Sequence, residues 1–221
     1  MDLSNEWLAK VSELGYSYHF TWMGQPIIQF PQDMVAMQEI IWAVKPDLIV
    51  ETGIARGGSL IYYASLLELI GGDGRVLGID IDVREHNRVA IEAHRMFKRI
   101  DMIHGSSVAP EVVAQVSSRC AGAKSVIVIL DSNHTHDHVL AELQAYSPLV
   151  TKGGYLVVFD TVIEEMPADS FPDRPWGIGD NPATAVRAFL KTTDRFEIDR
   201  AIPGKLQVTV ARSGYLRCIA D

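Results

Sequence analysis

The segment from Ile49 to Ser59 constrains the fold of this chain more than any other stretch. Its first residues belong to an apolar run, Leu48 to Val50, that predicts a buried strand. Glycines at positions 53, 57 and 58 then predict a tight loop, because glycine lets backbone approach a ligand closely. Apolar residues recur at helical spacing from Ser59 onward. A strand, a glycine loop and a helix N-terminus form a small-molecule site at one edge of a parallel sheet, although a plain tight turn has the same local pattern.

Composition narrows the class of protein. The 221 residues fit one domain with an added N-terminal segment. The formal charge of -8 argues against a nucleic-acid partner, which would need a basic surface. Cys120 and Cys218 fit neither a disulfide framework nor a metal motif, so we expect reduced thiols in a cytoplasmic protein. No signal peptide and no apolar run of about 20 residues is present, so we expect no membrane partner.

The order of apolar and periodic segments predicts the fold class. Strand patterns alternate with helical ones, which is typical of an open, doubly wound α/β sheet. We expect seven strands, mostly parallel, and a final pair that supplies an antiparallel edge strand. The predicted strands cover residues 48–50, 76–80, 100–104, 125–130, 155–159, 196–199 and 206–211, and the longer predicted helices cover residues 31–44, 83–98, 110–116 and 136–146.

Two segments lie outside this alternation. Residues 1–45 form a helical, aromatic-rich N-terminal segment, which we expect either to line a substrate pocket or to contact a second copy in a homo-oligomer. Residues 46–221 then make up the cofactor-binding domain. Residues 161–181 are irregular and rich in proline and acids, and a loop of this length in a compact domain is usually functional or disordered. We interpret it as a lid, followed by a helix that Asn181 caps.

Polar residues end five successive predicted strands and should meet at one edge of the sheet. Asp80, 27 residues after Gly53, is placed to accept hydrogen bonds from the two ribose hydroxyls of a nucleoside. Dinucleotide and S-adenosylmethionine folds share this feature. The glycine loop distinguishes the two folds. A dinucleotide site requires glycines at G-x-G-x-x-G spacing to bind its pyrophosphate, whereas the glycines here are at positions 53, 57 and 58. Glu51 would repel a pyrophosphate but suits the ammonium group of a methionine moiety, so the pattern favours S-adenosylmethionine.

The stretch from Asp131 to His138 is the second informative place. Asp131 and Asp160 end adjacent predicted strands and offer oxygen ligands to a hard divalent cation, unless both are merely solvated strand ends. His134 follows Asp131 by three residues and is poised as a general base. His136 and His138 fall in the first turn of a helix, where we expect surface histidines. Their alternating spacing disfavours a soft-metal cluster.

Taken in order, these motifs resemble the cephalosporin hydroxylase family, which has the class I S-adenosylmethionine-dependent methyltransferase fold. The resemblance covers about residues 20–215, and the edge of the sheet is similar, more distantly, to Mg-dependent catechol and macrolide-sugar O-methyltransferases. It rests on Trp22 to Asp33, Glu51-Thr52-Gly53, Arg56 to Ser59, Gly78-Ile79-Asp80, Gly105-Ser106-Ser107, Asp131-Ser132 with His134, and Gly153 to Val158.

The resemblance implies a set of site residues. The methionine part of the cofactor would contact Glu51, Gly53 and Ser59, the ribose would contact Asp80, and the adenine would lie beside Ser106 and Ser107. Arg56, Ile81 and Asp131 complete the implied cofactor-binding set. Magnesium would bind Asp131, Asp160 and Thr161, with His134 as the catalytic base. Such sites usually carry two oxygen-bearing residues at the end of the fifth strand, whereas Phe159 and Thr161 flank Asp160 here. Either Thr161 is a weak neutral ligand or one ligand is missing.

These observations predict an S-adenosylmethionine-dependent, Mg-assisted O-methyltransferase that acts on a hydroxyl group of a small molecule, a sugar or another natural-product intermediate. An oxidoreductase is the first alternative, either a hydroxylase with a 2-His-1-carboxylate iron site or a nicotinamide-dependent dehydrogenase. The α/β pattern and Glu51 oppose both. A binding subunit that keeps the fold without catalysis is the second alternative, and only Phe159 supports it.

Overall fold

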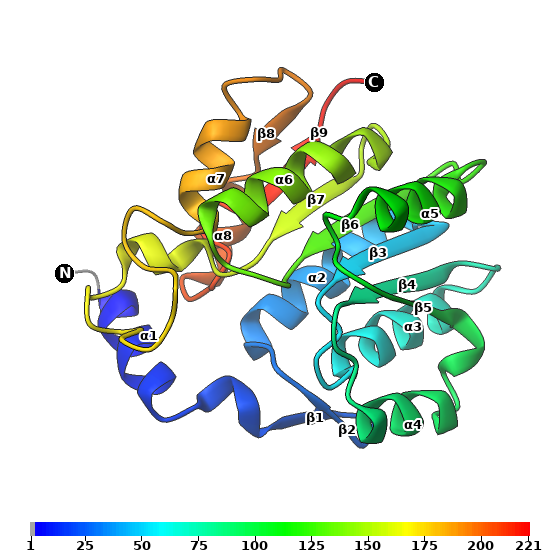
Figure 1. Cartoon of the computed structure of the whole chain (residues 1–221), viewed down its shortest axis with the longest axis horizontal. Helices are drawn as coiled ribbons and strands as arrows, with labels where there is room; N and C mark the ends of the chain where they lie inside the picture. Colours follow the sequence, from blue (N-terminus) through cyan, green and yellow to red (C-terminus); the bar gives the residue numbers. More distant parts are fainter. Residues whose placement is uncertain (1–2) are drawn as a thin grey trace.

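The computed structural model describes residues 3–221 and is organised around a seven-stranded sheet (Figure 1). The spatial order is β5-β4-β3-β6-β7-β9-β8. The first five strands of this order are parallel, whereas β9 runs antiparallel to both of its neighbours, so the edge strand β8 is paired antiparallel. The strands are β3 (Leu48–Thr52), β4 (Arg75–Asp80), β5 (Ile100–His104), β6 (Val126–Leu130), β7 (Tyr155–Val158), β8 (Phe196–Ile198) and β9 (Tyr215–Cys218). The predicted doubly wound, mostly parallel sheet is confirmed.

Helices cover both faces of this sheet, and the sequence of β6 shows why. All five residues of β6 are buried and apolar, and successive side chains point to opposite faces. Ile127 and Ile129 join the cluster packed against α2 (Pro31–Val44), α3 (Gly58–Ile70) and α4 (Glu85–Ala93). The alternate residues join the cluster packed against α5 (Pro110–Cys120), α6 (His136–Tyr146) and α7 (Pro182–Phe189). None of the helices between residues 3 and 221 combines the length and the apolar run that crossing a bilayer requires.

The N-terminal segment packs beside the sheet. It contains α1 (Leu3–Glu13), a 3-10 turn (Tyr16–His19) and a short hairpin of β1 (Phe20–Trp22) and β2 (Gln25–Ile27). Leu8 and Phe30 form a small cluster with Val162 and Met166, so α1 lies beside the segment that follows β7 (Figure 1). Aromatic rings of residues 7, 16, 20 and 30 stack edge-to-face or tilted within this region. The segment is therefore held next to the predicted lid.

One predicted strand is wrong. Residues 206–211 alternate like a strand, but α8 (Ala201–Leu206) ends at the first of them, residues 207–211 are irregular, and the last strand is β9. The cause is a buried carboxylate, Asp33, at the start of α2. Its oxygens accept hydrogen bonds from the Thr209 hydroxyl, the Val210 amide at 3.0 Å and the Tyr215 hydroxyl at 2.7 Å. These contacts tie the segment to α2 and away from the sheet.

Smaller differences concern the ends of elements. The predicted helix over residues 83–98 ends at Ala93, and a 3-10 turn (Phe97–Arg99) follows. Residue 94 has an extended backbone, and its side chain accepts a hydrogen bond from the amide of Met96 at 3.1 Å. This local contact competes with the helix. The predicted lid begins with a 3-10 turn (Thr161–Glu165), and a further 3-10 turn (Ser147–Leu149) follows α6.

Candidate active site

The carboxyl ends of the parallel strands bring the predicted site residues to one edge of the sheet. In the register of the sheet, Thr52 lies beside Ile79 and Leu130, and Leu130 lies beside Val158. Each of these positions is followed within two residues by a loop that carries a predicted ligand. The topology therefore places the glycine loop, Asp80, Asp131 and Asp160 along a single edge.

The glycine loop follows β3, and two of its glycines are required by the packing. Gly53 has φ +94°, and a Cβ there would collide with the carbonyl oxygen of Asp131. A Cβ on Gly58 would collide with backbone of Pro26 and Ile27 in β2. Only glycine lets the loop lie this close to two other chain segments. The loop, the end of β6 and the hairpin thus form one rigid floor.

Asp80 holds this loop in place. Its Oδ2 accepts hydrogen bonds from the amides of Ile54 at 2.8 Å and Ala55 at 3.0 Å, and its Oδ1 accepts one from Asp82 at 2.9 Å. Sequence reasoning assigned Asp80 to a ribose and missed this contact with the loop. A carboxylate has about four lone-pair sites, so the same group retains capacity for ligand hydroxyls.

Glu51 is fully buried beneath the loop. Ser59 donates a hydrogen bond to its Oε2 at 2.7 Å, whereas Oε1 has no hydrogen-bond partner among residues 3–221. Burial, reinforced by the charge of Asp80, raises the pKa of the Glu51 carboxyl to about 8. A carboxylate with a free oxygen in such a place is suited to a cationic group that enters from the loop.

Two adjoining cavities open at this edge, of about 520 and about 300 Å³. Gly53 and Ser132 contribute to both cavities, so a ligand that spans them passes over the glycine loop. Among the predicted residues, the larger cavity is lined by Gly53, Arg56, Ser59, Asp131, His134 and Asp160, and the smaller one by Gly53, Asp80, Ile81, Ser106 and Ser107. The structure thus brings the predicted cofactor and metal residues together with the exception of Thr161, and Glu51, which lines neither cavity, contacts Ser59.

Three side chains in the larger cavity form a candidate metal centre. Ligand atoms of Asp131, His134 and Asp160 all lie within 4.8 Å of one another, and His134 Nε2 is 3.2 Å from Asp160 Oδ2. Gln29, which sequence reasoning missed, donates to Asp131 Oδ2 at 3.3 Å. Burial, followed by the charges of Asp160 and Glu51, raises the pKa of Asp131 well above its usual range. This concentration of carboxylates favours cationic ligands.

Thr161 does not join this group. Asp160 has φ +55°, a left-handed conformation that turns the chain directly after the carboxylate. Thr161 is buried as a result, and its hydroxyl accepts a hydrogen bond from the amide of Ser213 at 3.1 Å. Its side chain is absent from the residues that line either cavity. The structure therefore leaves Asp160 as the oxygen ligand that follows β7.

The predicted lid forms part of the wall of the larger cavity. Met166, Phe171 and Arg174 line it, together with Trp176. The Trp176 ring meets the imidazole of His134 edge-on, with centroids 4.8 Å apart, and the Arg174 guanidinium lies 5.3 Å from the centre of the Trp176 ring. Four residues of the N-terminal segment line the same cavity, namely Leu8, Ser12, Glu13 and Tyr18.

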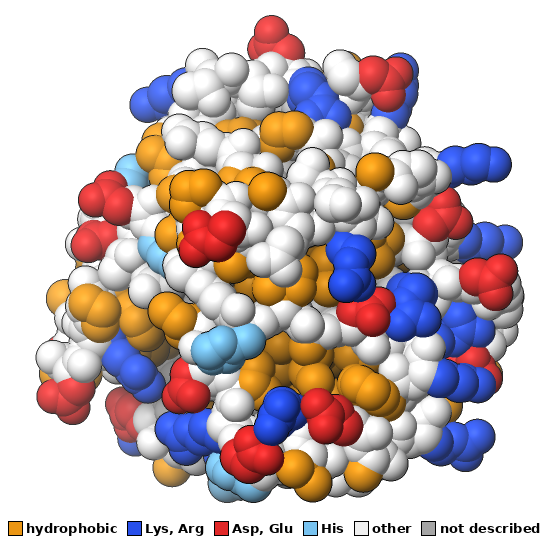
Figure 2. Space-filling view, turned by 45° about the vertical axis from the view of Figure 1, so that its right-hand side comes forward, with side chains coloured by type: hydrophobic (Ala, Val, Ile, Leu, Met, Phe, Trp, Pro, Cys, Tyr) orange, Lys and Arg blue, Asp and Glu red, His pale blue; other side chains and the backbone are white. Residues whose placement is uncertain are grey.

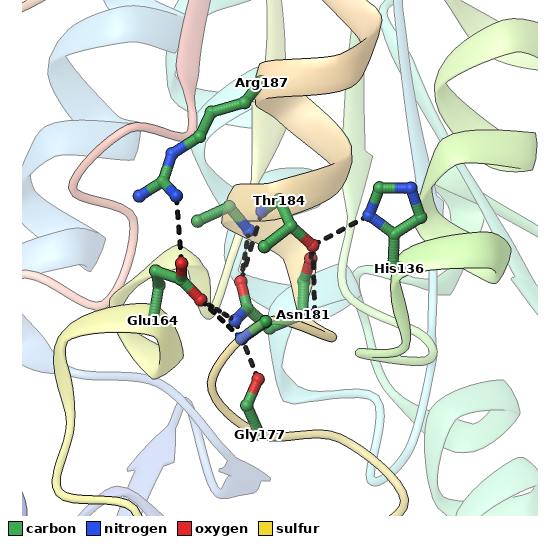
Figure 3. Close-up of polar contacts among 8 residues, drawn as sticks. His136, Glu164, Gly177, Asn181, Thr184 and Arg187 are labelled. Carbon is green, nitrogen blue, oxygen red and sulfur yellow. Dashed lines mark hydrogen bonds and ion pairs between the residues drawn. The ribbon is translucent and has the colours of Figure 1, made fainter.

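Polar contacts pin both ends of the lid (Figure 3). Glu164 accepts hydrogen bonds from the Gly179 amide at 2.8 Å and the Asn181 side chain at 2.5 Å, and it pairs with Arg187 at 2.9 Å. Asn181 caps α7 as predicted. His136, expected at the surface, instead contacts the Thr184 hydroxyl through Nδ1 at 2.8 Å. The lid, α6 and α7 are thus joined.

The surface of the protein carries charges of both signs. On the face shown in Figure 2, lysine and arginine side chains are interspersed with acidic ones, and apolar side chains are visible between them. Basic and acidic side chains are therefore not separated into two patches in this view. Carboxylates gather instead at the floor of the cavities.

Comparison with known proteins supports this description. A family model described as rhamnosyl O-methyltransferase/CmcI matches residues 14–219. A rhamnosyl O-methyltransferase of Mycobacterium leprae is 31% identical over 198 residues, which cover 89% of this chain and 82% of that protein.

Solved structures share the fold at lower identity. A structure of CmcI with Mg and S-adenosylmethionine has a TM-score of 0.63 at 19% identity and covers 92% of this chain and 78% of its own. An O-methyltransferase from Bacillus cereus in complex with S-adenosylhomocysteine has a TM-score of 0.59 at 15% identity, with coverage of 100% and 92%. These likenesses confirm the predicted fold.

Proposed function

Because the chain belongs to the rhamnosyl O-methyltransferase/CmcI family, we propose that it transfers the methyl group of S-adenosylmethionine to a hydroxyl group of a small molecule, with magnesium as an aid. The observation that carries this proposal is the carboxylate-lined edge where a glycine loop, Glu51 and the Asp131–His134–Asp160 group meet. A sulfonium, an ammonium and a divalent cation are all suited to such an edge, whereas a pyrophosphate is not.

The two cavities suggest how the cofactor lies. The smaller cavity, with Asp80 and Ser107, would take the adenosine part. The methionine part would then cross Gly53 toward Ser59, where the free Oε1 of Glu51 offers an acceptor to its ammonium group. The methyl group would face the rest of the larger cavity, where His134 and the lid are found. This arrangement leaves the acceptor molecule between the lid and the N-terminal segment.

The donor set fits a hard divalent cation, because Asp131 and Asp160 supply carboxylate oxygens close together. When bound there, magnesium would lower the pKa of the acceptor hydroxyl as a Lewis acid. Thr161 lies outside this set, so the acceptor hydroxyl and water are the remaining sources of oxygen ligands in our proposal.

His134 is the proposed base. It would take the proton of the acceptor hydroxyl while the oxygen attacks the methyl carbon in line with the carbon–sulfur bond. The new bond joins oxygen to carbon, the broken bond returns its electron pair to sulfur, and S-adenosylhomocysteine leaves. General base catalysis of this kind contributes about 10²- to 10⁴-fold, and positioning of the two reactants contributes the larger share. Trp176, edge-on to the imidazole, would keep the ring oriented and shield it from water.

The name of the mycobacterial relative suggests the acceptor. We propose a sugar hydroxyl, with a rhamnosyl group as the first candidate. The test is transfer of labelled methyl from S-adenosylmethionine to a panel of rhamnosides and non-sugar phenols, with Mg²⁺ or with a chelator. We expect labelled rhamnoside only with Mg²⁺, and a large loss in Asp160→Asn. His86→Ala, at an exposed position of α4, is the matched control. Labelling of phenols alone would contradict the sugar assignment.

A further inference from the structure

A polar network at the start of α6 borders the smaller cavity, and its two helix residues have no part in the mechanism above. It joins Ser107, which follows β5, Ser132, which follows β6, and two residues one turn apart on α6, His138 and Glu142. His138 Nε2 lies 3.1 Å from Ser107 Oγ, 3.3 Å from Ser132 Oγ and 3.4 Å from Glu142 Oε1. Ser132 donates to Glu142 Oε1 at 2.7 Å. Loops from two strands and one helix are therefore needed to build it.

Glu142 is the unusual member of this network, because its side chain is 0% exposed and its Oε2 has no partner in the described part of the chain. A buried carboxylate costs free energy unless it is well paired, and a protein core without function rarely contains one. The histidine it contacts also lines the cavity wall. Both features point to a ligand-directed role of His138.

The contacts decide which nitrogen of His138 carries the proton. The Ser132 hydroxyl donates its hydrogen to Glu142, so toward the imidazole the Ser132 oxygen can act only as an acceptor. The carboxylate of Glu142 is likewise an acceptor. Nε2 therefore donates, and Nδ1 of the neutral ring is an acceptor. Nδ1 makes no hydrogen bond with the rest of residues 3–221.

We propose that His138 is a specificity-determining residue that reads the amino group of the cofactor's adenine base, with Glu142 as the positioning residue that fixes its tautomer. The inference rests on the proposed function and deepens it. The smaller cavity is lined by both Asp80, the proposed ribose contact, and His138. Ser106 and Ser107 line it as well. In our proposal, a purine attached to the ribose would lie beside these residues. Its exocyclic amino group is a donor that matches an accepting Nδ1.

The test compares two ligands that differ at this one group. S-adenosylhomocysteine carries the amino group, whereas S-inosylhomocysteine carries a carbonyl oxygen, which Nδ1 would repel. Dissociation constants of both are measured by calorimetry for the wild type, His138→Ala, His138→Gln and the exposed control His86→Ala. A site built to bind one polar group rejects the analogue that lacks it. We expect the wild type and His86→Ala to prefer S-adenosylhomocysteine by about tenfold or more.

The two variants at position 138 make distinct predictions. His138→Ala should lose the preference and bring the ratio of the two constants close to one. His138→Gln should bind both ligands about equally well, because its amide can turn either its donor or its acceptor to the base. A wild-type preference that persists in either variant would overturn the role of His138. Absence of S-adenosylhomocysteine binding by the wild type would instead overturn the proposed function. The ratio of the two dissociation constants is measured within one protein, so it does not depend on the active fraction of that protein. If one variant at position 138 fails to fold, the other still tests the role of His138.

Discussion

Substitution of Glu51 by Gln should move stability and cofactor affinity in opposite directions. The side chain is fully buried, and burial raises the pKa of its carboxyl from 4.5 to about 8. The folded protein therefore holds a proton that the unfolded chain releases above pH 4.5. Its stability falls as the pH rises from about 4.5 to about 8. Gln removes this titration and keeps an oxygen that accepts from Ser59.

The expected magnitude follows from the shift. Each pKa unit corresponds to about 1.4 kcal/mol, so at pH 7 the raised pKa costs the folded state about 3 kcal/mol. The protonated carboxyl carries one O–H donor and the Gln amide carries two N–H donors, so the cost of one additional buried donor offsets part of this gain. Glu51→Gln should therefore raise the free energy of unfolding by up to about 3 kcal/mol at pH 7 and have little effect at pH 4.

Cofactor binding should respond with the opposite sign. The ammonium group of S-adenosylhomocysteine needs an ionised Glu51, and a hydrogen bond between charged groups contributes about 1.5–3 kcal/mol. Loss of the charge should weaken binding about 10- to 100-fold. In the wild type, binding near pH 7 should release a proton, since the ligand favours the ionised carboxylate over the protonated one.

Two assays check this prediction. Denaturant unfolding from pH 4 to pH 8 measures the stability difference, and Glu6→Gln, at an exposed position of α1, is the control. Calorimetry in buffers of different ionisation enthalpy measures both affinity and proton release. A Glu51→Gln protein that is less stable than the wild type at pH 7, or that binds S-adenosylhomocysteine equally well, would refute the reasoning.

Three further predictions concern other parts of the site and fold. Gly53→Ala should destabilise the protein and weaken cofactor binding more than tenfold, because a Cβ collides with Asp131 in addition to the left-handed strain of about 1–2 kcal/mol. Gly24→Ala, with a similar φ and open space around it, isolates the strain in the same thermal-unfolding and binding assays, and equal losses in the two would exclude the collision. His134→Ala should lower kcat about 10²- to 10⁴-fold in a methyl-transfer assay. The concentration of Mg²⁺ that gives half-maximal activity should not change, and a large increase in it would assign His134 to the metal rather than to the proton. Tyr215→Phe should lower the free energy of unfolding by about 1.5–3 kcal/mol, because Asp33 loses a hydrogen bond. The Kd for S-adenosylhomocysteine should stay the same. Unchanged stability would argue against Asp33 as the anchor of the C-terminal segment.

Local pattern was sufficient for most of the fold. Buried runs such as Val126 to Leu130 and the glycines at 53, 57 and 58 identify the strands and the loop by themselves. The family predicted from the ordered motifs is confirmed by the family model. The rule that parallel strands end at one edge was enough to bring Asp131, His134 and Asp160 together, although the roles of these residues stay predictions.

Contacts between distant segments explain what the sequence could not show. The strand predicted at 206–211 is lost because Asp33, about 176 residues away, takes the hydrogen bonds of Thr209 and Val210. His136 and His138 leave the expected surface setting because Thr184 and Ser107 reach them from other elements. The turn at Asp160, which buries the next residue, likewise has no signature in sequence. The homo-oligomeric state stays a prediction.

Calorimetric titration with S-adenosylhomocysteine, with and without Mg²⁺ and against NAD, tests the central claim most directly. The carboxylate-lined edge with its glycine loop predicts tight binding of S-adenosylhomocysteine and no binding of NAD, whose pyrophosphate would meet Glu51. Binding of NAD, or no binding of S-adenosylhomocysteine under either condition, would contradict the assignment of this site to methyl transfer.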